Sequence, residues 1–396
     1  MGSLSMSRPG KGNALLAVIV AGVALDTTTY AMVVPLLPDL ARAMGFGQLA
    51  AGVLLAGYAV GLCVATPVAG IAVARRGAPA PLALGLAGLA GSLALFVLAD
   101  DFLTLLMART LQGAASAALW TAGLALIAAH WQEPARGRAM GLVMAGFAGG
   151  LLVGPPLGGG IADTLGMAAV FLLPAGLAAL LLMAATRPLY HWPRQTAAPP
   201  GASLTLFRDR GILGAAAVVA VTAGLLGLLE PTLPLAMEAR FGSGATVIGL
   251  MFGLLALMFA AAAPLAGEWT GRYGALSTIR LGAWPLVAVL PLFALAPGEA
   301  WIAPLFAATG ALLALMVSPT LPAMAARVDR LDGASYGMAF AVFNLAFALG
   351  LLAGPLLGAA LTAWLGLAAA LVVAASTLAA AAAALAGLRG LHGFTK

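Results

Sequence analysis

The sequence predicts an all-α integral membrane protein with twelve transmembrane helices arranged in two six-helix halves. Three observations predict this class: the apolar composition, a series of apolar segments of membrane-spanning length, and short motifs that recur in both halves. Residues of the AVILMFWYC set make up 63% of the 396 residues and charged residues 8%, against roughly 25% charged in a soluble domain. So few charges cannot cover a soluble protein of this size. The single cysteine, Cys63, excludes a disulfide scaffold, and the apolar content excludes intrinsic disorder.

The apolar segments are separated by short charged or Gly/Pro-containing breaks. Most of them are near or above the ~20 residues that cross a hydrocarbon layer of about 30 Å. In chain order they are 14–38, 48–74, 79–99, 102–129, 137–162, 166–187, 211–237, 245–270, 276–297, 300–326, 333–362 and 364–389.

The basic residues predict the orientation of these helices. With the N-terminus in the cytoplasm, two basic residues, Arg42 and Arg240, lie outside, Arg109 lies within a helix, and the other sixteen of nineteen lie inside. This bias follows the positive-inside rule and places both tails, 1–13 and 390–396, in the cytoplasm. The net charge of +6 therefore reports topology and no nucleic-acid partner. Those sixteen are Arg8, Lys11, Arg75, Arg76, Arg136, Arg138, Arg187, Arg194, Arg208, Arg210, Arg272, Arg280, Arg327, Arg330, Arg389 and Lys396.

A proline-rich polar stretch divides the chain into halves 14–187 and 211–389, joined by a cytoplasmic linker, 188–210. Three motifs recur at offsets of 196 to 200 residues, which indicates an internal repeat. A parallel repeat of this kind is typical of secondary transporters, whose site lies between the halves near mid-membrane. The recurring pairs are Pro35-Leu-Leu-Pro38 with Pro231-Thr-Leu-Pro234, Gly70 and Arg75-Arg76-Gly77 with Gly267 and Arg272-Tyr273-Gly274, and Gly154-Pro155 and Gly158 with Gly354-Pro355 and Gly358.

Three charged residues, Asp26, Arg109 and Glu230, lie deep within predicted helices, away from their ends. From the 1.5 Å rise per residue, Asp26 lies about 18 Å from the outer end of its helix, and Arg109 and Glu230 each lie about 10 Å deep. An ionised side chain at a helix centre costs about 2.5–3.5 kcal/mol, so we expect each carboxylate to face protein or a water-filled cavity. The alternatives are structural carboxyl groups and an arginine that reaches the outer surface. Tyr30 is one turn from Asp26 and could help to hold an organic cation.

The motifs resemble those of the major facilitator superfamily, and in particular its twelve-helix drug:proton antiporters. Gly154-Pro155-Pro156-Leu157-Gly158-Gly159 is similar to the antiporter signature, and Arg109-Thr110-Leu111-Gln112-Gly113 to the helix-four motif. The segment from Gly70 to Gly77 resembles the first cytoplasmic loop, although the usual acidic residue is Ala74 here and Gly271 in the second copy. A loop gate built on that carboxylate is not expected.

A closer likeness is to the vesicular monoamine and acetylcholine transporters. It rests on Leu25-Asp26, on Val33-Val34-Pro35-Leu36-Leu37-Pro38, on Leu229-Glu230-Pro231-Thr232-Leu233-Pro234 and on Val153-Gly154-Pro155-Pro156. The chain departs from that subfamily at three charged positions, where it has Tyr58, Ser318 and Asn344. Alignment with the subfamily also places Phe252, Phe259 and Phe347 at the positions of its cavity aromatic residues. A phenylalanine in a membrane helix is as often a packing residue, however, and the same holds for Trp120.

The resemblance implies a proton-coupled exporter of cationic or lipophilic compounds, amines among them, in the inner membrane of a bacterium. We expect a monomer whose partners are protons and a small organic cation. We do not expect the protein to be an enzyme or to bind a cofactor or a metal. A sugar or metabolite symporter and a non-transporting membrane sensor are the alternatives. The predicted substrate-binding residues are Asp26, Thr27, Tyr30, Tyr58, Phe252, Phe259, Ser318, Asn344 and Phe347. The predicted proton-coupling residues are Glu230, Arg109, Asp26 and Gln112, with the roles of Asp26 and Glu230 interchangeable, and the predicted conformational motif comprises Gly70, Arg75, Gly77, Gly154, Pro155, Gly158, Gly354 and Pro355.

Overall fold

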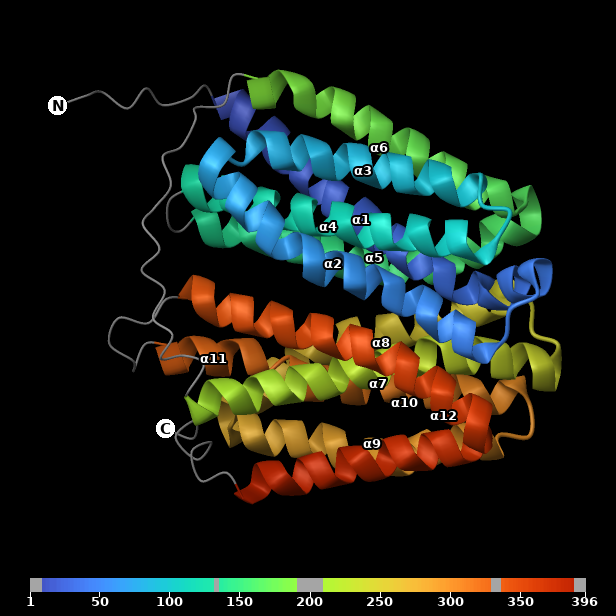
Figure 1. Cartoon of the computed structure of the whole chain (residues 1–396). Coiled ribbons are helices and arrows are strands. Elements are labelled where there is room, and N and C mark those ends of the chain that lie inside the picture. Colours follow the sequence, from blue (N-terminus) through green and yellow to red (C-terminus); the bar gives the residue numbers. More distant parts are fainter. Residues whose placement is uncertain (1–8, 132–134, 191–208, 329–335, 388–396) are drawn as a thin grey trace. The chain divides into compact units, whose positions relative to one another are not determined.

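The computed structural model describes residues 9–131, 135–190, 209–328 and 336–387, and every regular element in them is an α-helix. Figure 1 shows these helices with their labels. The C-terminal tail, residues 1–8 of the N-terminal tail and most of the predicted linker lie outside the described residues, while residues 9–13, predicted as tail, belong to the first helix. The helices are α1 (Pro9–Met44), α2 (Gln48–Arg76), α3 (Pro79–Val97), α4 (Phe102–His130), α5 (Ala135–Leu165), α6 (Met167–Tyr190), α7 (Arg210–Phe241), α8 (Ala245–Tyr273), α9 (Ala275–Leu295), α10 (Glu299–Val317), α11 (Thr320–Val328) and α12 (Tyr336–Gly387).

The first nine predicted segments correspond one to one to α1 through α9. The tenth, 300–326, was predicted as one helix and is two, α10 and α11. Ser318 and Pro319 separate them, because proline has no N–H to donate to the carbonyl four residues earlier and its ring crowds that carbonyl. The predicted tenth segment is thus one candidate membrane span, Glu299–Met324, but its helix is interrupted at these two residues.

The last two predicted segments appear as one element, α12, with a break inside it. Gly366 has φ 80° and ψ 166°, which no helical residue adopts. It separates helical stretches 336–365 and 367–387, so the boundary lies a few residues after the predicted one at 362–364. In the described residues, eleven helices are long and apolar enough to cross a membrane, with the two sides of Gly366 counted together. This arrangement is consistent with the twelve predicted spans.

The internal repeat is visible in the backbone. The glycines with positive φ in the described part of the chain form three pairs, Gly45 with Gly242, Gly77 with Gly274, and Gly166 with Gly366. The pairs are separated by 197, 197 and 200 residues, the spacing of the sequence motifs. Within each pair the two φ angles differ by 6° or less. The same turns therefore close equivalent helices in both halves.

Helix contacts repeat in the same way. A Cβ at Gly154 on α5 would lie 2.6 Å from the carbonyl oxygen of Thr28 on α1, and one at Gly354 on α12 would collide with the backbone of Gly224 on α7. Gly158 and Gly358 meet α1 and α7 in the same manner one turn further along. Small residues at these positions let helix backbones approach closely. Gly154, Gly158 and Gly354 of the predicted conformational motif are thus contact points between helices, whereas a Cβ at Gly70 would meet nothing within 4 Å.

We expect Gly154→Ala to lower the stability of the folded protein by about 1–3 kcal/mol, because α1 and α5 must separate to admit the methyl group. Gly160→Ala is the matched control on the same helix, since nothing lies within 4 Å of a Cβ at that position. There the better helix propensity of alanine should leave stability unchanged or slightly raised. Thermal unfolding of both variants in one detergent tests this. Equal unfolding temperatures for the two would contradict the close packing.

By their internal contacts the residues form two compact units. The first comprises Met1–Val33 and Val60–Pro199, and the second comprises Val34–Ala59 and Pro200–Lys396. The segment Val34–Ala59, the end of α1 and the start of α2, thus packs with the second unit. Within it, the Gln48 side-chain amide donates to the Pro231 carbonyl on α7 at 3.0 Å, and Arg42 is 3.2 Å from the Glu238 carboxylate. Each unit has its own apolar cluster of buried side chains.

Candidate functional site

Three charged side chains are buried among the described residues: Asp26 and Arg109 in the first unit and Glu230 in the second. Asp26 and Arg109 are 0% exposed and Glu230 is 4% exposed. They are the three residues that the sequence singled out by their position within apolar helices. The burial of Arg109 excludes the alternative of an arginine that reaches the outer surface. Buried charges need partners, so the contacts of each define the site.

The Asp26 carboxylate is held by two donors from α4. The Ser116 hydroxyl donates to Oδ2 at 2.6 Å, and the indole N–H of Trp120 donates to the same oxygen at 3.2 Å. Both hydrogen bonds converge on one oxygen of the carboxyl group. The Trp120 ring also packs edge-to-face on Phe147 of α5, with centroids 5.6 Å apart. Asp26 is therefore fixed by the packing of α1 against α4.

Arg109 is held one turn nearer the predicted outer side of the same helix pair. Its guanidinium donates to the Gln112 side-chain carbonyl at 2.8 Å and to the Tyr30 main-chain carbonyl at 3.2 Å. The Gln112 amide in turn donates to the Thr29 hydroxyl at 3.0 Å, which donates to the Asp26 carbonyl at 2.9 Å. Arg109, Gln112 and Thr29 thus form a buried hydrogen-bonded chain beside Asp26.

Helical periodicity creates this polar surface. On α4 the residues Arg109, Gln112, Ser116 and Trp120 are three or four positions apart and share one face. On α1 the facing residues Thr29 and Tyr30 lie three and four positions after Asp26. Sequence reasoning missed Ser116 and Thr29 and gave Trp120 no role. The polar stripe on α4 was the signal that could have found them.

Tyr30 has a different neighbour from the predicted one. Its ring lies under the Arg109 guanidinium, 4.7 Å from ring centroid to Cζ, a cation–π contact within the protein. The aromatic side chain that contacts the Asp26 carboxylate is Trp120. An organic cation at Asp26 would therefore meet the Trp120 ring first. Thr27 is buried and bonds to the Val23 carbonyl of its own helix at 2.9 Å.

Glu230 lies in the second unit, within α7, where the Leu-Glu-Pro-x-Leu-Pro element interrupts the backbone hydrogen bonds of the helix. Pro234 cannot donate to the Glu230 carbonyl, and the Pro231 carbonyl accepts the hydrogen bond from Gln48. Glu230 thus sits where α7 has an incomplete backbone ladder. Its predicted partner Arg109 belongs to the other unit, and the Arg109–Glu230 ion pair stays a prediction.

The remaining predicted residues are spread over both units. Tyr58 is buried in α2. Phe252 packs edge-to-face on Phe306 with centroids 5.0 Å apart, inside the apolar cluster of the second unit, and Phe259 packs against that cluster. Phe347 packs against a second apolar cluster, around Ile212 and Val342. Ser318 is half-buried after α10, Asn344 is exposed on α12, and Arg75 is exposed at the end of α2. A role of these residues in binding or gating stays a prediction.

One ion pair outside the spans fixes the start of α7. The Asp209 carboxylate caps the helix, accepting from the Gly211 and Ile212 N–H groups at 2.9 and 3.0 Å. It also accepts bonds from the Arg327 guanidinium at 2.8 to 3.1 Å. Burial raises the pKa of Asp209, but the hydrogen bonds and charge of Arg327 and the backbone donors outweigh it, so the pKa lies below its ordinary value. The hydrogen bonds that the structure shows for this carboxylate all come from the start of α7 or from Arg327.

The repeated fold, its apolar helices of membrane-spanning length and its buried charges define a polytopic helical membrane protein built of two similar halves. The family model of the Major Facilitator Superfamily matches residues 19–230 and again residues 215–392. The chain belongs to this superfamily and is related to the vesicular amine and acetylcholine transporters, as the motifs of the sequence predicted.

Two groups of relatives illustrate this. The chromaffin granule amine transporter of Rattus norvegicus is 32% identical over 327 residues, which are 80% of this chain and 61% of the relative. The human vesicular acetylcholine transporter is 30% identical over 314 residues, 77% of this chain and 59% of the relative. The chain thus spans about 60% of the length of these two relatives. A solved bacterial homologue of the human lysosomal transporter Spinster, in an inward-facing unoccupied conformation, has a TM-score of 0.79 at 14% identity, covering 98% of this chain and 99% of that one. That likeness shows the fold alone.

Proposed function

We propose that the protein exports organic cations, amines in particular, in exchange for external protons across the inner membrane of a bacterium. The observation that carries the proposal is the buried Asp26 carboxylate, held by Ser116 and Trp120 between membrane-spanning helices. A fixed carboxylate next to an aromatic ring attracts a cation through both charge and the ring quadrupole. The names of the relatives, an amine transporter and an acetylcholine transporter, support a cationic substrate.

The three buried charges suggest how transport is coupled to protons. Asp26 balances the charge of the substrate, and Glu230 binds the proton. Arg109 stabilises ionised Glu230 in one conformation, and its chain through Gln112 and Thr29 connects it to the helix that carries Asp26. Protonation of Glu230 weakens that attraction, so substrate release and proton binding occur on the same side. The antiporter-type Gly154–Gly159 motif, whose glycines contact α1, favours exchange over symport.

The test uses the full chain in proteoliposomes and a labelled quaternary ammonium compound. A quaternary amine has no neutral form, so it does not accumulate in acidic vesicles by itself. We expect accumulation when the vesicle interior is acidic and its loss when an ionophore collapses the pH gradient. Accumulation with the opposite gradient would indicate a symporter. Binding of the cation without any flux would indicate a non-transporting sensor, and either result would overturn the proposal.

A further inference from the structure

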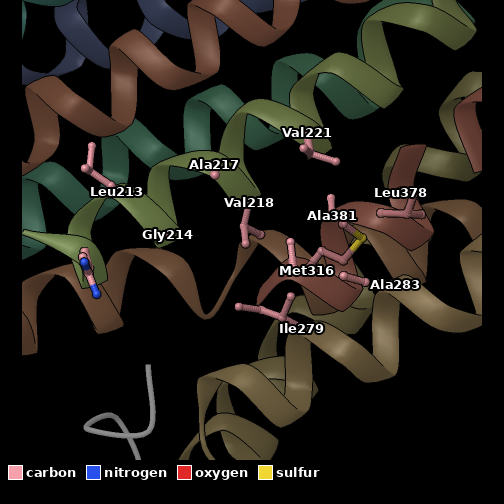
Figure 2. Close-up of a pocket in the computed structure, with 13 residues that line it drawn as sticks. Leu213, Gly214, Ala217, Val218, Val221, Ile279, Ala283, Met316, Leu378 and Ala381 are labelled. Carbon is pink, nitrogen blue, oxygen red and sulfur yellow. The ribbon is translucent and has the colours of Figure 1, made fainter. Parts of the chain in front are cut away.

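The second unit contains an apolar cavity of about 360 Å³ that lies apart from Glu230. Thirteen residues from α7, α9, α10 and α12 line it, and twelve of them are Gly, Ala, Val, Leu, Ile or Met. Figure 2 shows labelled side chains of α7 together with Ile279, Met316 and Ala381 around this space. The thirteenth lining residue is Arg210, at the start of α7. The cavity is therefore apolar along its walls and basic at one point.

The internal repeat explains why this place is hollow. Four lining residues are small where the equivalent positions of the first unit are bulky: Gly214 for Val18, Ala283 for Leu86, Ala381 for Leu181 and Ala382 for Leu182. In the first unit Val18 and Leu86 belong to the buried apolar cluster, and Leu181 and Leu182 pack against it. Three lining positions, Leu213, Val218 and Leu378, are larger than their counterparts, and they do not close the space. The equivalent of Arg210 is Ala14, so the cation is also specific to the second unit.

The dimensions of the cavity match one leaflet of a membrane. Its lining residues on α7 run from Arg210 to Val221 along one helical face. Eleven residues at a rise of 1.5 Å span about 16 Å, roughly half of the ~30 Å hydrocarbon layer. Arg210 is the first residue of its membrane-spanning segment, so the basic point lies at the membrane surface that the sequence predicts to be cytoplasmic. The walls continue from there toward mid-membrane.

The charge at this surface is available to a ligand. Arg210 is exposed, and within the described ranges it has neither a hydrogen bond nor an ion pair. The neighbouring acid, Asp209, is directed at the helix start and at Arg327. The cavity contains no acidic lining residue. It would therefore repel the organic cations proposed as substrate and attract an anion with an apolar body.

We propose that this cavity binds one anionic phospholipid from the cytoplasmic leaflet, with an acyl chain along the apolar walls and the phosphate on Arg210. Guanidinium groups bind phosphate with two parallel hydrogen bonds. Basic pockets between transmembrane helices on the cytoplasmic side suit anionic lipid headgroups. The lipid would fill the space that leucine and valine fill in the first unit. It would thereby stabilise the contact of α7 with α9 and α12.

The test counts lipids bound to the purified full chain by native mass spectrometry. Phosphatidylglycerol and phosphatidylcholine with identical acyl chains are compared as probes. We expect the wild type to retain one phosphatidylglycerol at least tenfold more tightly than phosphatidylcholine, and Arg210→Gln to lose this preference. Arg272→Gln is the control, because Arg272 is also exposed at the predicted cytoplasmic end of a helix of the same unit but does not line the cavity.

A second pair of variants tests the apolar part. Ala381→Leu and Gly214→Val place in the cavity the side chains that the first unit carries at the equivalent positions. Each should reduce retention of phosphatidylglycerol at least tenfold, and thermal unfolding shows which of the two variants is properly folded. Retention unchanged in Arg210→Gln, or unchanged in a folded cavity-filling variant, overturns the proposal. Equal retention of the two lipids by the wild type also overturns it, because the headgroup charge would then play no part.

Discussion

Asp26→Asn should abolish high-affinity binding of a quaternary ammonium compound, with a loss of at least tenfold to a hundredfold. The substitution keeps the size of the side chain, and the Asn carbonyl can still accept the bonds from Ser116 and Trp120. What it removes is the charge that balances the cation, and a tenfold to hundredfold loss of affinity corresponds to about 1.4–2.7 kcal/mol of binding free energy. Binding of uncharged lipophilic compounds should change far less. Equilibrium binding of radiolabelled ligands to the detergent-solubilised protein measures both.

Ser116→Ala separates charge from local structure in this experiment. It removes the 2.6 Å hydrogen bond to Asp26 Oδ2 and leaves the carboxylate in place. We expect this variant to bind the quaternary amine, with affinity closer to the wild type than to Asp26→Asn. If the wild type and Asp26→Asn bind the quaternary amine equally, the carboxylate has a structural role and the cation binds elsewhere.

Glu230→Gln should abolish accumulation of substrate driven by a pH gradient while downhill exchange of substrate continues. Glutamine resembles the protonated carboxyl in shape and charge, so the protein would behave as if its proton were never released. Glu238→Gln is the matched control, since Glu238 lies two turns further along α7, is 30% exposed and pairs with Arg42. That variant should accumulate substrate at close to the wild-type level.

Uphill accumulation and downhill exchange are measured in the same proteoliposomes, with and without a pH gradient that is acidic inside. Undiminished uphill transport by Glu230→Gln would assign the proton to another group, and Asp26 is then the carboxyl to test. Loss of both uphill and downhill transport would mean that Glu230 is required for the conformational change itself. These outcomes distinguish the coupling role from a general role in transport.

The positions of the helices agree best between the sequence prediction and the structure. Their positions follow from the length of each apolar segment, and nine of the predicted segments coincide with α1 through α9. The tenth segment is interrupted at Ser318 and Pro319, where a proline within an apolar run decides the break. The break between the last two segments was predicted at 362–364 and lies at Gly366, and the pairing of Gly366 with Gly166 in the repeat could have given its exact position.

The burial of the three charged residues could also be predicted from the sequence, for an energetic reason. A charge in the middle of an apolar helix is costly, so Asp26, Arg109 and Glu230 had to be enclosed by protein, and they are. Their hydrogen-bond partners could not be predicted in the same way. Ser116 and Thr29 are ordinary polar residues in their own helices, and only the contact between α1 and α4 brings Ser116 to the Asp26 carboxylate and Thr29 to the Gln112 amide that binds Arg109.

The sequence by itself determined the membrane class, the repeat and the family, because these depend on composition, period and motif spacing along the chain. The tertiary structure alone decided which polar groups meet. It placed Trp120, for which the sequence predicted no role, against the Asp26 carboxylate, and the Tyr30 ring against the Arg109 guanidinium. It also showed that Gly214, Ala283 and Ala381, unremarkable small residues in three separate helices, leave one shared space beside Arg210. Contacts between distant helices depend on how side chains of all the facing residues pack, and no single segment contains that information.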